Sequence, residues 1–162
     1  MDTAYLLAGS NIGNKTAYLQ QATKIVEERC GYIIARSHIY ETAAWGVLDQ
    51  PSFYNQAFAV QTHLSPEVLM QTLLDIEAII GRQRLQKMGP RIIDLDILMI
   101  DELIFNTPLL TVPHPHLPER RFALTPLAEI APNLIHPVLH KTITQLLEEC
   151  GDVLPVKQLD VM

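Results

Sequence analysis

Two acidic residues, Asp94 and Asp96, interrupt the most apolar run of the chain, which reads GPRIIDLDILMI. The run has the composition of a buried strand, where an unpaired carboxylate is costly and tends to take up a proton. Residues two apart in a strand face the same side, so the two carboxylates project together while Ile93, Leu95 and Ile97 face the other side. The spacing therefore predicts a close pair of carboxylates.

The Asp94–Asp96 pair requires a compensating group. Two close carboxylates either share a proton or hold a cation between them. Mg²⁺ commonly uses one or two carboxylates together with the phosphates of a substrate, so the pair is a candidate metal site. The alternative is that one aspartate ends the strand at the surface, because Asp-x-Asp is a short and common pattern.

Basic residues surround this pair in the sequence. The chain has seven arginines, and those in this region are Arg82, Arg84, Arg91, Arg120 and Arg121, accompanied by Lys87 and His114. Guanidinium groups match phosphate oxygens, and Mg²⁺ bridges phosphates to carboxylates, so the combination favours a polyphosphate ligand. A solvated basic loop that balances nearby acids would explain Arg84 or Lys87, but it explains Arg91 poorly, because Arg91 stands three residues from Asp94.

Two further motifs carry weaker signals. GSNIGN, at residues 9–14, could present backbone N–H groups to a phosphate ahead of a helix, but it lacks the P-loop pattern and also fits a plain polar turn. His114 and His116 could suggest a metal-ligand pair, although no third ligand stands at a suitable spacing. We therefore expect His114 to donate to a phosphate and His116 to belong to the loop.

The patterns along the chain predict the elements that position these residues. The predicted strands are 4–8, 32–41, 53–63 and 89–100, with a short hairpin partner at 103–105. The predicted helices are 15–30, 66–80, 118–129 and 142–150. The order β-α-β-β-α-β predicts an α+β, ferredoxin-like fold, with a mostly antiparallel sheet, helices on one face and C-terminal additions.

The composition predicts an ordinary globular protein with a single domain over residues 1–162. Apolar residues make up 48% and charged residues 19%, and the net charge of −6 argues against a general nucleic-acid binder. Cys30 and Cys150 lack the spacing of a metal site and fit thiols in a reducing cytosol. No signal peptide and no apolar run near the ~18 residues that span a bilayer are seen, so we expect a cytoplasmic protein without membrane contact.

Five blocks stand out along the chain. They are GSNIGN, YETAAWG…DQPSFYNQA, IEAIIGRQR, KMGPRIIDLDIL and LTVPHPHLPERRFAL…EIAP, and together they cover most of residues 5 to 132. In order and spacing, these blocks resemble the pterin pyrophosphokinases of folate biosynthesis (6-hydroxymethyl-7,8-dihydropterin pyrophosphokinase). Five ordered blocks are far more specific than any one of them.

The resemblance implies a reaction and a fold. Members of the family transfer the terminal two phosphates of ATP, as pyrophosphate, to the hydroxymethyl oxygen of the pterin and release AMP. They use ATP as co-substrate, two Mg²⁺ ions and a ferredoxin-like fold. The resemblance therefore implies a Mg²⁺-dependent diphosphotransferase of the cytoplasm, which we expect to act on these small molecules as a monomer.

The resemblance also implies roles for individual residues. Asp94 and Asp96 would hold both metals and serve catalysis together with Arg82 and Arg91. The residues implied to bind ATP are Arg82, Arg84, Arg91, Ile97, Thr111, His114 and Arg120. Those implied to bind the pterin are Thr42, Trp45, Phe53, Asn55 and Phe122, with the two phenylalanines on either side of its ring. The residues implied to form the floor of the site and to support it are Gly9, Ser10, Asn11 and Glu77.

The chain departs from some relatives in the loops that we expect to close over the substrates. Met88 stands where some relatives carry Trp, and Leu109 and Pro115 stand where some carry Arg and Tyr. Ala43 and Ala44 replace two prolines, and the loop before GPR is one residue shorter than in some members. These changes concern the packing of the loops and peripheral contacts to ATP, not the aspartate pair.

Two other functions use some of the same features. A nucleotidyl- or glycosyltransferase can use the same Asp-x-Asp metal site, and a non-catalytic nucleotide-binding module can use the same fold. Neither needs Phe53, Asn55 and Phe122 together. A flat heteroaromatic ring such as a pterin does need aromatic faces and an amide that both donates and accepts.

Overall fold

The computed structural model describes residues 1–43, 51–81 and 92–161. Its strands are β1 (Asp2–Ser10), β2 (Tyr32–Arg36), β3 (Tyr40–Thr42), β4 (Phe53–Thr62), β5 (Asp94–Ile100), β6 (Phe105–Asn106), β7 (Thr111–Val112) and β8 (Val156–Gln158). Its α-helices are α1 (Lys15–Arg29), α2 (Pro66–Ile80), α3 (Arg121–Ile130) and α4 (Ile143–Glu149), and a 3₁₀ turn, η1 (Leu117–Glu119), precedes α3.

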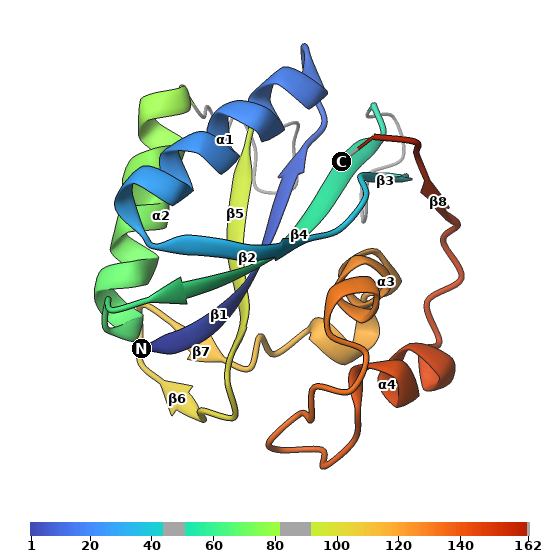
Figure 1. Ribbon diagram of the computed structural model, residues 1–162. Coiled ribbons are helices and arrows are strands. Elements are labelled where there is room, and N and C mark those ends of the chain that lie inside the picture. The colour runs from blue at the N-terminus through green and yellow to red at the C-terminus, as the bar shows by residue number, and fades with distance from the viewer. Residues whose placement is uncertain (44–50, 82–91, 162) are drawn as a thin grey trace.

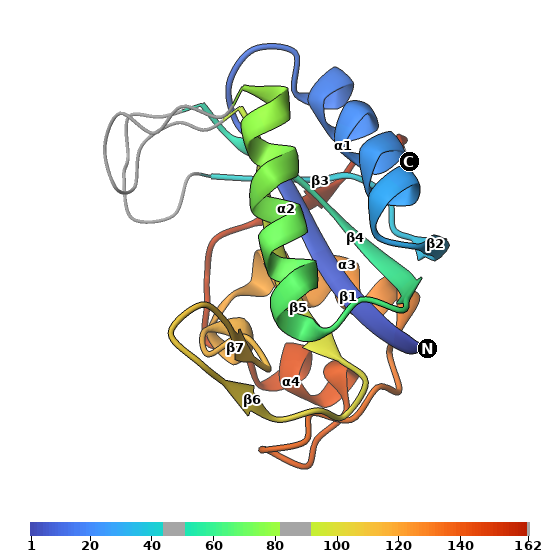
Figure 2. The same ribbon diagram turned by 90° about the vertical axis from the view of Figure 1, so that its left-hand side faces the viewer.

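One antiparallel sheet forms the centre of the molecule. Its strand order is β5-β1-β4-β3-β8. Strands β2 and β3 both pair with β4, with β3 opposite residues 53–55 and β2 opposite residues 58–61. Helices α1 and α2 lie side by side on one face, whereas α3 and α4 cover the other face (Figures 1 and 2). The ferredoxin-like fold is confirmed, but the sheet is covered on both faces and not on one, because the C-terminal additions bring α3 and α4 onto the second face.

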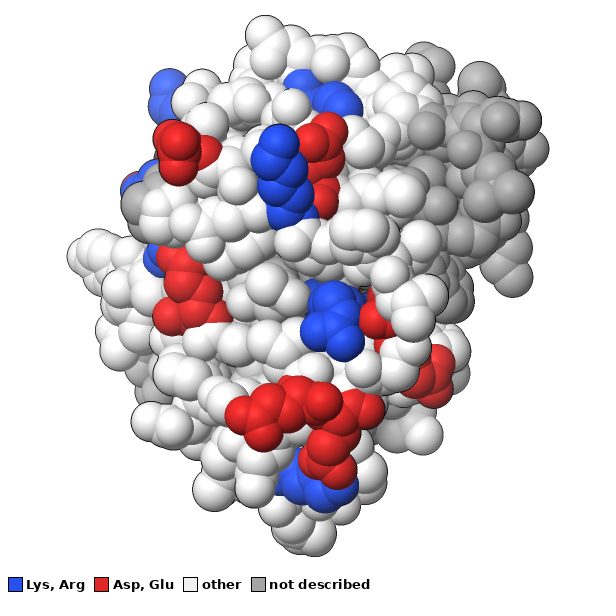
Figure 3. Space-filling model, turned by 90° about the vertical axis from the view of Figure 1, so that its right-hand side faces the viewer, with Lys and Arg blue, Asp and Glu red and all other residues white. Residues whose placement is uncertain are grey.

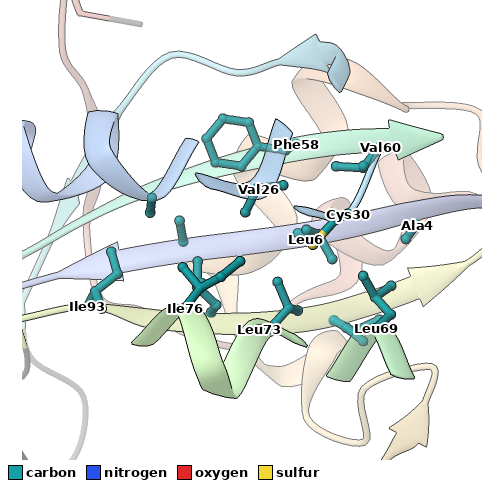
Figure 4. Close-up of a cluster of buried hydrophobic side chains, with 14 of the residues drawn as sticks. Ala4, Leu6, Val26, Cys30, Phe58, Val60, Leu69, Leu73, Ile76 and Ile93 are labelled. Carbon is teal, nitrogen blue, oxygen red and sulfur yellow. The ribbon is translucent and has the colours of Figure 1, made fainter. Parts of the chain in front are cut away.

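Apolar side chains are buried on both faces of the sheet. On the α1 and α2 side, Leu6 of β1 and Phe58 of β4 pack in one cluster with Ile76 of α2 (Figure 4). On the other side, Leu7 of β1 packs in a second cluster with Leu124 of α3. A shift of one residue in the pairing of β1 would exchange these faces, so the two clusters fix its register and make the sheet a rigid support.

Helix α2 has the boundaries expected from the sequence. The hydroxyl of Ser65 accepts from Val68 N at 3.4 Å, and Pro66 and Glu67 occupy the first turn. Gly81 ends the helix with a φ of +99°, a left-handed conformation that glycine adopts easily. These local signals determine which side chains of α2 face β5.

The expected single strand at 32–41 is divided into β2 and β3. The division occurs at Ser37, whose side chain takes over part of the strand pairing. Its Oγ accepts from Ala57 N at 2.9 Å and donates to His38 O at 2.6 Å. The chain therefore leaves the regular ladder for three residues before β3 begins at Tyr40.

Two features of the C-terminal half differ from the expectation. The hairpin partner of Phe105 is Val112 of β7, whereas the sequence pattern had suggested the strand that became β5. Strand β8, which pairs with β3, had no predicted counterpart. Among the described residues, no helix combines the length and the apolar character needed to cross a membrane.

Candidate active site

Asp94 and Asp96 lie on β5, and their side chains are half-buried. Leu95 and Ile97 point into the cluster beneath α1 and α2, so the two aspartates face the α3 side of the sheet. Asp96 is directly opposite Leu7 of β1, which belongs to the cluster on that side. The predicted same-face pair of carboxylates is therefore confirmed.

The backbone between the two aspartates is held by α2. The buried carboxylate of Glu77 accepts a hydrogen bond from Leu95 N at 2.7 Å. Because Leu95 separates Asp94 from Asp96, this bond fixes the stretch of strand that aims both carboxylates. The geometry agrees with the supporting role expected for Glu77.

Gly9 of β1 lies in register between the two sides of the candidate site. It is opposite Asn55 of β4 on one side and opposite Asp94 of β5 on the other. A β-carbon at Gly9 would lie 2.5 Å from Asn55 Oδ1 and 3.6 Å from Phe53 Cδ1. The absence of a side chain at Gly9 therefore lets the amide of Asn55 lie close against β1, beside the strand that carries Asp94. The next residue, Ser10, is fully buried.

The segment that enters β4 is anchored to the start of α1. The buried Asn11 donates to Pro51 O at 3.2 Å, and Lys15 Nζ donates to Ser52 O at 3.0 Å. Ser52 Oγ in turn donates to Glu41 Oε2 at 2.7 Å. Sequence reasoning did not single out Lys15, because a lysine at the start of a helix carries no distinguishing pattern.

His114 lies in the segment between β7 and η1. Its backbone N donates to Leu98 O at 2.9 Å, which holds this segment against β5 just after the aspartates. Its Nδ1 accepts from His116 N at 3.1 Å, so Nε2 carries the proton and is the donor available to a ligand. Burial, Arg120 and His116 lower the pKa of His114 to about 4, so the ring is neutral at pH 7.

Arg120 and Arg121 are adjacent in the sequence but serve different parts of the molecule. The guanidinium of Arg120 lies over the ring of Phe122, 5.7 Å from its centroid. The guanidinium of Arg121 donates instead to Cys150 O at 2.9 Å and to Asp152 O at 3.0 Å. Arg121 was expected among the basic groups around the aspartates, and the structure shows that it binds the C-terminal segment.

Three other predicted residues have defined positions. The hydroxyl of Thr42, a buried residue, donates to Pro155 O at 3.1 Å. The hydroxyl of Thr111 donates to Asn106 Oδ1 at 3.0 Å. The side chain of Ile97 lies in the apolar cluster beneath α1 and α2, so a contact of Ile97 with ATP would have to come from its backbone.

Some of the predicted residues lie outside the described ranges. These are Trp45, Arg82, Arg84 and Arg91. The departures at Ala44 and Met88 also lie there, as does most of both loops that were expected to close over the substrates. Their roles remain predictions from the sequence.

The aspartate pair has the donor chemistry of a magnesium site that shares its ligands with a substrate. Among the described residues, no group of three His, Cys, Asp or Glu side chains is arranged to hold a metal ion. Asp94 and Asp96 offer two carboxylates, and an ion held by them would take its remaining ligands from phosphates and water. Mg²⁺ binds in this way, because it is reluctant to lose its water and usually takes one or two carboxylates.

Known proteins with similar sequences point to one family. The family model described as 7,8-dihydro-6-hydroxymethylpterin-pyrophosphokinase (HPPK) matches residues 5–132. The chain is 40% identical over 149 residues to the 2-amino-4-hydroxy-6-hydroxymethyldihydropteridine pyrophosphokinase of Aquifex aeolicus, over 92% of each chain. It is 44% identical over 136 residues to the protein of the same name from Methylorubrum extorquens, over 83% of this chain and 86% of that protein.

Solved structures agree with the fold. The chain is similar to the Plasmodium falciparum HPPK-DHPS wild type with SDX-DHP, with a TM-score of 0.72 at 20% identity over 92% of this chain and 43% of that chain. The structure described as HPPK-DHPS in complex with substrates gives a TM-score of 0.75 at 17% identity, over 91% and 43% of the two chains. This chain thus spans less than half of those proteins, and at these identities the likeness concerns the fold alone.

The family match and the sequence relatives together cover the strands and loops that carry Gly9, Asn55, Asp94 and Asp96. Relatives of about the same length as this chain carry the name of the same enzyme. The chain belongs to the 7,8-dihydro-6-hydroxymethylpterin-pyrophosphokinase family, whose members transfer pyrophosphate from ATP to the hydroxymethyl group of the dihydropterin in folate biosynthesis.

Proposed function

We propose that this chain binds its two substrates side by side on the α3 face of the sheet, with the pterin near Asn55 and the phosphates of ATP near Asp94 and Asp96. The observation that carries this proposal is the register of Asn55, Gly9 and Asp94 across three adjacent strands. This register places Asn55, whose amide can recognise a ring, on one side of Gly9. It places Asp94, whose carboxylate can hold a metal, on the other side. A hydroxymethyl group on the ring would then point toward the phosphates.

The pterin half of the proposed site consists of Phe53, Asn55 and Phe122, with Thr42 and Trp45 at the edge of the ring. Asn55 is 4% exposed and carries both a donor and an acceptor, which suits the N–H and C=O groups of a pterin. Aromatic faces on both sides of a flat ring bury it and orient its hydroxymethyl group. The closeness of Phe53 and Asn55 to Gly9 supports this assignment.

The nucleotide half of the proposed site consists of Arg82, Arg84, Arg91, His114 and Arg120 for the phosphates, and Thr111 and the backbone of Ile97 for the adenosine. The lowered pKa of His114 supports a role as a neutral Nε2–H donor to a phosphate oxygen. The guanidinium groups supply the positive charge, because arginine stays protonated at any physiological pH.

Asp94 and Asp96 would hold two Mg²⁺ ions between the triphosphate and the pterin. When bound, these ions would neutralise phosphate charge and lower the pKa of the pterin hydroxyl, so that no strongly basic side chain is required. The contribution of the chain is to aim the carboxylates through β5 and Glu77, and to orient the ring through Asn55 and the phenylalanines. Residues 42–52 and 82–90 would exclude water, which would otherwise consume ATP.

At the β-phosphorus, the reaction forms one P–O bond and breaks another. The hydroxymethyl oxygen forms a bond to the β-phosphorus of ATP, and its proton passes to water. The bond between the β-phosphorus and the oxygen that links it to the α-phosphorus breaks, and AMP leaves with that oxygen. In-line attack requires the two substrates to be held in a fixed relative orientation, which a site built on a rigid sheet provides.

The test is a product analysis with and without metal. Incubation with ATP, Mg²⁺ and 6-hydroxymethyl-7,8-dihydropterin should yield AMP in step with pterin pyrophosphate, and chelation of Mg²⁺ should abolish both. ADP as the nucleotide product would contradict pyrophosphoryl transfer. Free pyrophosphate or a released nucleoside diphosphate would instead indicate a nucleotidyl- or glycosyltransferase.

The proposed enzyme acts as a cytoplasmic monomer on small molecules, without nucleic acid or membrane partners. The net charge of −6 argues against a nucleic-acid partner, and the free thiols Cys30 and Cys150 fit a reducing cytosol. On the face shown in Figure 3, acidic and basic side chains are interspersed and do not form a basic stripe. Light scattering on the purified protein should give a mass near 18.2 kDa, and a mass twice that value would contradict the monomer.

A further inference from the structure

The C-terminal strap, defined here as residues 150–158, lies beyond residues 5–132 that the family model matches. It starts at the end of α4 and ends in β8. Near its start it is bound by Arg121, which donates through Nη2 to Cys150 O at 2.9 Å and through Nε to Asp152 O at 3.0 Å. Arg121 N also donates to Asp152 Oδ2 at 3.2 Å. This end of the strap is therefore joined to the residue that immediately precedes Phe122.

The other end of the strap is joined to β3. Thr42 donates through Oγ1 to Pro155 O at 3.1 Å and is opposite Val156 of β8. On its other side, Thr42 is opposite Phe53 of β4. Thr42 is only 4% exposed, and its hydroxyl proton is engaged by the strap. A direct hydrogen bond from this proton to the pterin would require the contact with Pro155 to break.

The strap thus connects the neighbours of the two aromatic residues assigned to the pterin. We propose that Arg121 and Thr42 are positioning residues that act through the strap to set the separation between Phe53 and Phe122, and so the affinity for the pterin. This inference rests on the proposed pterin site. It gives a role to Arg121 and to a segment that the family blocks do not contain.

The expected effect follows from the short range of ring contacts. A gap of 0.5–1 Å beyond the optimal separation already loses about a quarter to a half of the dispersion attraction between two surfaces. If Phe53 and Phe122 are held less firmly at their separation, the pterin should therefore bind more weakly. Asp94, Asp96 and His114, which are assigned to the phosphates, lie on elements other than α3 and the strap, so affinity for ATP should change little.

The experiment compares Arg121→Gln, Thr42→Val and the double variant with the parent protein. Dissociation constants for the pterin and for ATP are measured by calorimetry, and KM and kcat are measured for both substrates. We expect each single variant to bind the pterin about fivefold more weakly, the size of effect that loss of a buried hydrogen bond gives. The affinity for ATP should stay within about twofold of the parent, since no phosphate contact is lost.

Coupling and rescue separate positioning from general damage. If both residues act through one strap, the double variant should lose less affinity than the product of the single losses. Thr42→Ser, which keeps the hydroxyl, should recover most of the affinity that Thr42→Val loses. Arg29→Gln, at an exposed arginine in the last turn of α1, is the matched control and should bind the pterin like the parent.

Two results would overturn the inference. Pterin affinity within twofold of the parent in both single variants, with lower melting temperatures, would mean that the strap only stabilises the fold. Equal losses for ATP and pterin would mean that the site is disturbed as a whole. If Arg121→Gln does not fold, Arg121→Lys, which keeps the charge but not the forked contact to the two carbonyls of the strap, carries the test.

Phe53→Ala and Phe122→Ala, measured in parallel, separate the test of the strap inference from the test of the proposed pterin site. If these variants bind the pterin normally, the proposed pterin site is wrong and the inference falls with it. If they lose affinity while Arg121→Gln and Thr42→Val do not, the pterin site stands and only the strap inference is overturned.

Discussion

At the scale of the residue, the site depends on Gly9 as much as on the charged groups near it. Gly9 has neighbours on both sides in the sheet, and one of them, Asn55, occupies the space next to its α-carbon. Its φ is not in the left-handed region, so glycine is required here by the space around it and not by the backbone conformation. The absence of a side chain leaves room for the amide of Asn55, next to the place where the two substrates are proposed to meet.

Gly9→Ala should therefore weaken pterin binding while the protein remains folded. The new methyl group would lie 2.5 Å from Asn55 Oδ1 and would displace this buried amide. We expect the KM for the pterin to rise roughly tenfold, because the displaced amide of Asn55 would no longer be oriented toward the ring. The KM for ATP should change much less. Steady-state kinetics with each substrate varied in turn gives the answer. Gln21→Ala, at an exposed residue of α1, is the control and should leave the kinetics unchanged. Unchanged pterin kinetics in Gly9→Ala would contradict the assignment of Asn55.

Asp96→Ala should reduce the rate by roughly 10²-fold or more, because the charge stabilisation that a bound metal provides is worth several kcal/mol. The measurement is kcat at saturating Mg²⁺, ATP and pterin. Asp75→Ala, at a residue of α2 whose carboxylate accepts from Gln71 on the same helix, should leave the rate unchanged. A rate for Asp96→Ala within roughly threefold of the parent would mean that Asp96 is not a ligand of the catalytic metal.

At the scale of the element, local signals determined what could be predicted. Ser65, Pro66 and Gly81 act on the backbone of their own turns, so the limits of α2 followed from the sequence. The common direction of Asp94 and Asp96 followed in the same way from the period of a strand. The division of residues 32–41 into two strands did not follow from the sequence, because it depends on a contact between Ser37 and Ala57.

The C-terminal elements were harder to predict for the same reason. Strand β8 is short and exists by pairing with β3, more than a hundred residues earlier in the chain. Arg120 and Arg121 gave the same signal in the sequence, yet only the folded chain shows that Arg121 turns to Asp152. Pairings between distant segments decide such cases, and a single sequence does not display them.

Glu77→Ala should lower both stability and activity, because it disturbs the contact between α2 and β5. Loss of the carboxylate leaves the buried N–H of Leu95 without this acceptor, which costs about 1–3 kcal/mol. Urea denaturation gives the stability, and the Mg²⁺ concentration at half-maximal activity reports on the aspartates. Glu77→Gln keeps an acceptor oxygen and should be the milder change, so equal effects of the two substitutions would argue against this account.

At the scale of the whole molecule, Glu129 of α3 joins separate parts of the chain. It accepts from Tyr40 OH at 2.6 Å and lies 2.9 Å from His38 Nδ1, and Tyr40 OH also contacts Gln158 of β8. Burial alone would raise the pKa of Glu129, but the hydrogen bonds from Tyr40 and His38 outweigh it and lower the pKa below its ordinary value. The ionised form of Glu129 therefore stabilises the junction of α3, β3 and β8.

This junction should make stability depend on pH in one direction. A carboxyl group whose pKa is lowered by folding contributes stability above its unfolded pKa, and the contribution is lost as the pH falls through the folded pKa. The stability difference between the parent and Glu129→Gln should thus be largest near neutral pH and shrink below about pH 4. Urea denaturation over this range measures it. Glu149→Gln, at the exposed ion pair with Lys141, should show little difference, and a gap for Glu129→Gln that does not vary with pH would contradict the prediction.

The contact between Glu77 and Leu95 has a second consequence, which concerns association between molecules. Strand β5 is an edge strand of the sheet. The exposed backbone N–H and C=O groups of an edge strand can pair with a strand from another chain. Glu77 occupies the N–H of Leu95, and the N–H of His114 occupies the carbonyl of Leu98. The bond from Leu95 to Glu77, which fixes the backbone between the aspartates, therefore also occupies a backbone group at this edge of the sheet. The geometry of the site and protection against aggregation thus depend on the same contact.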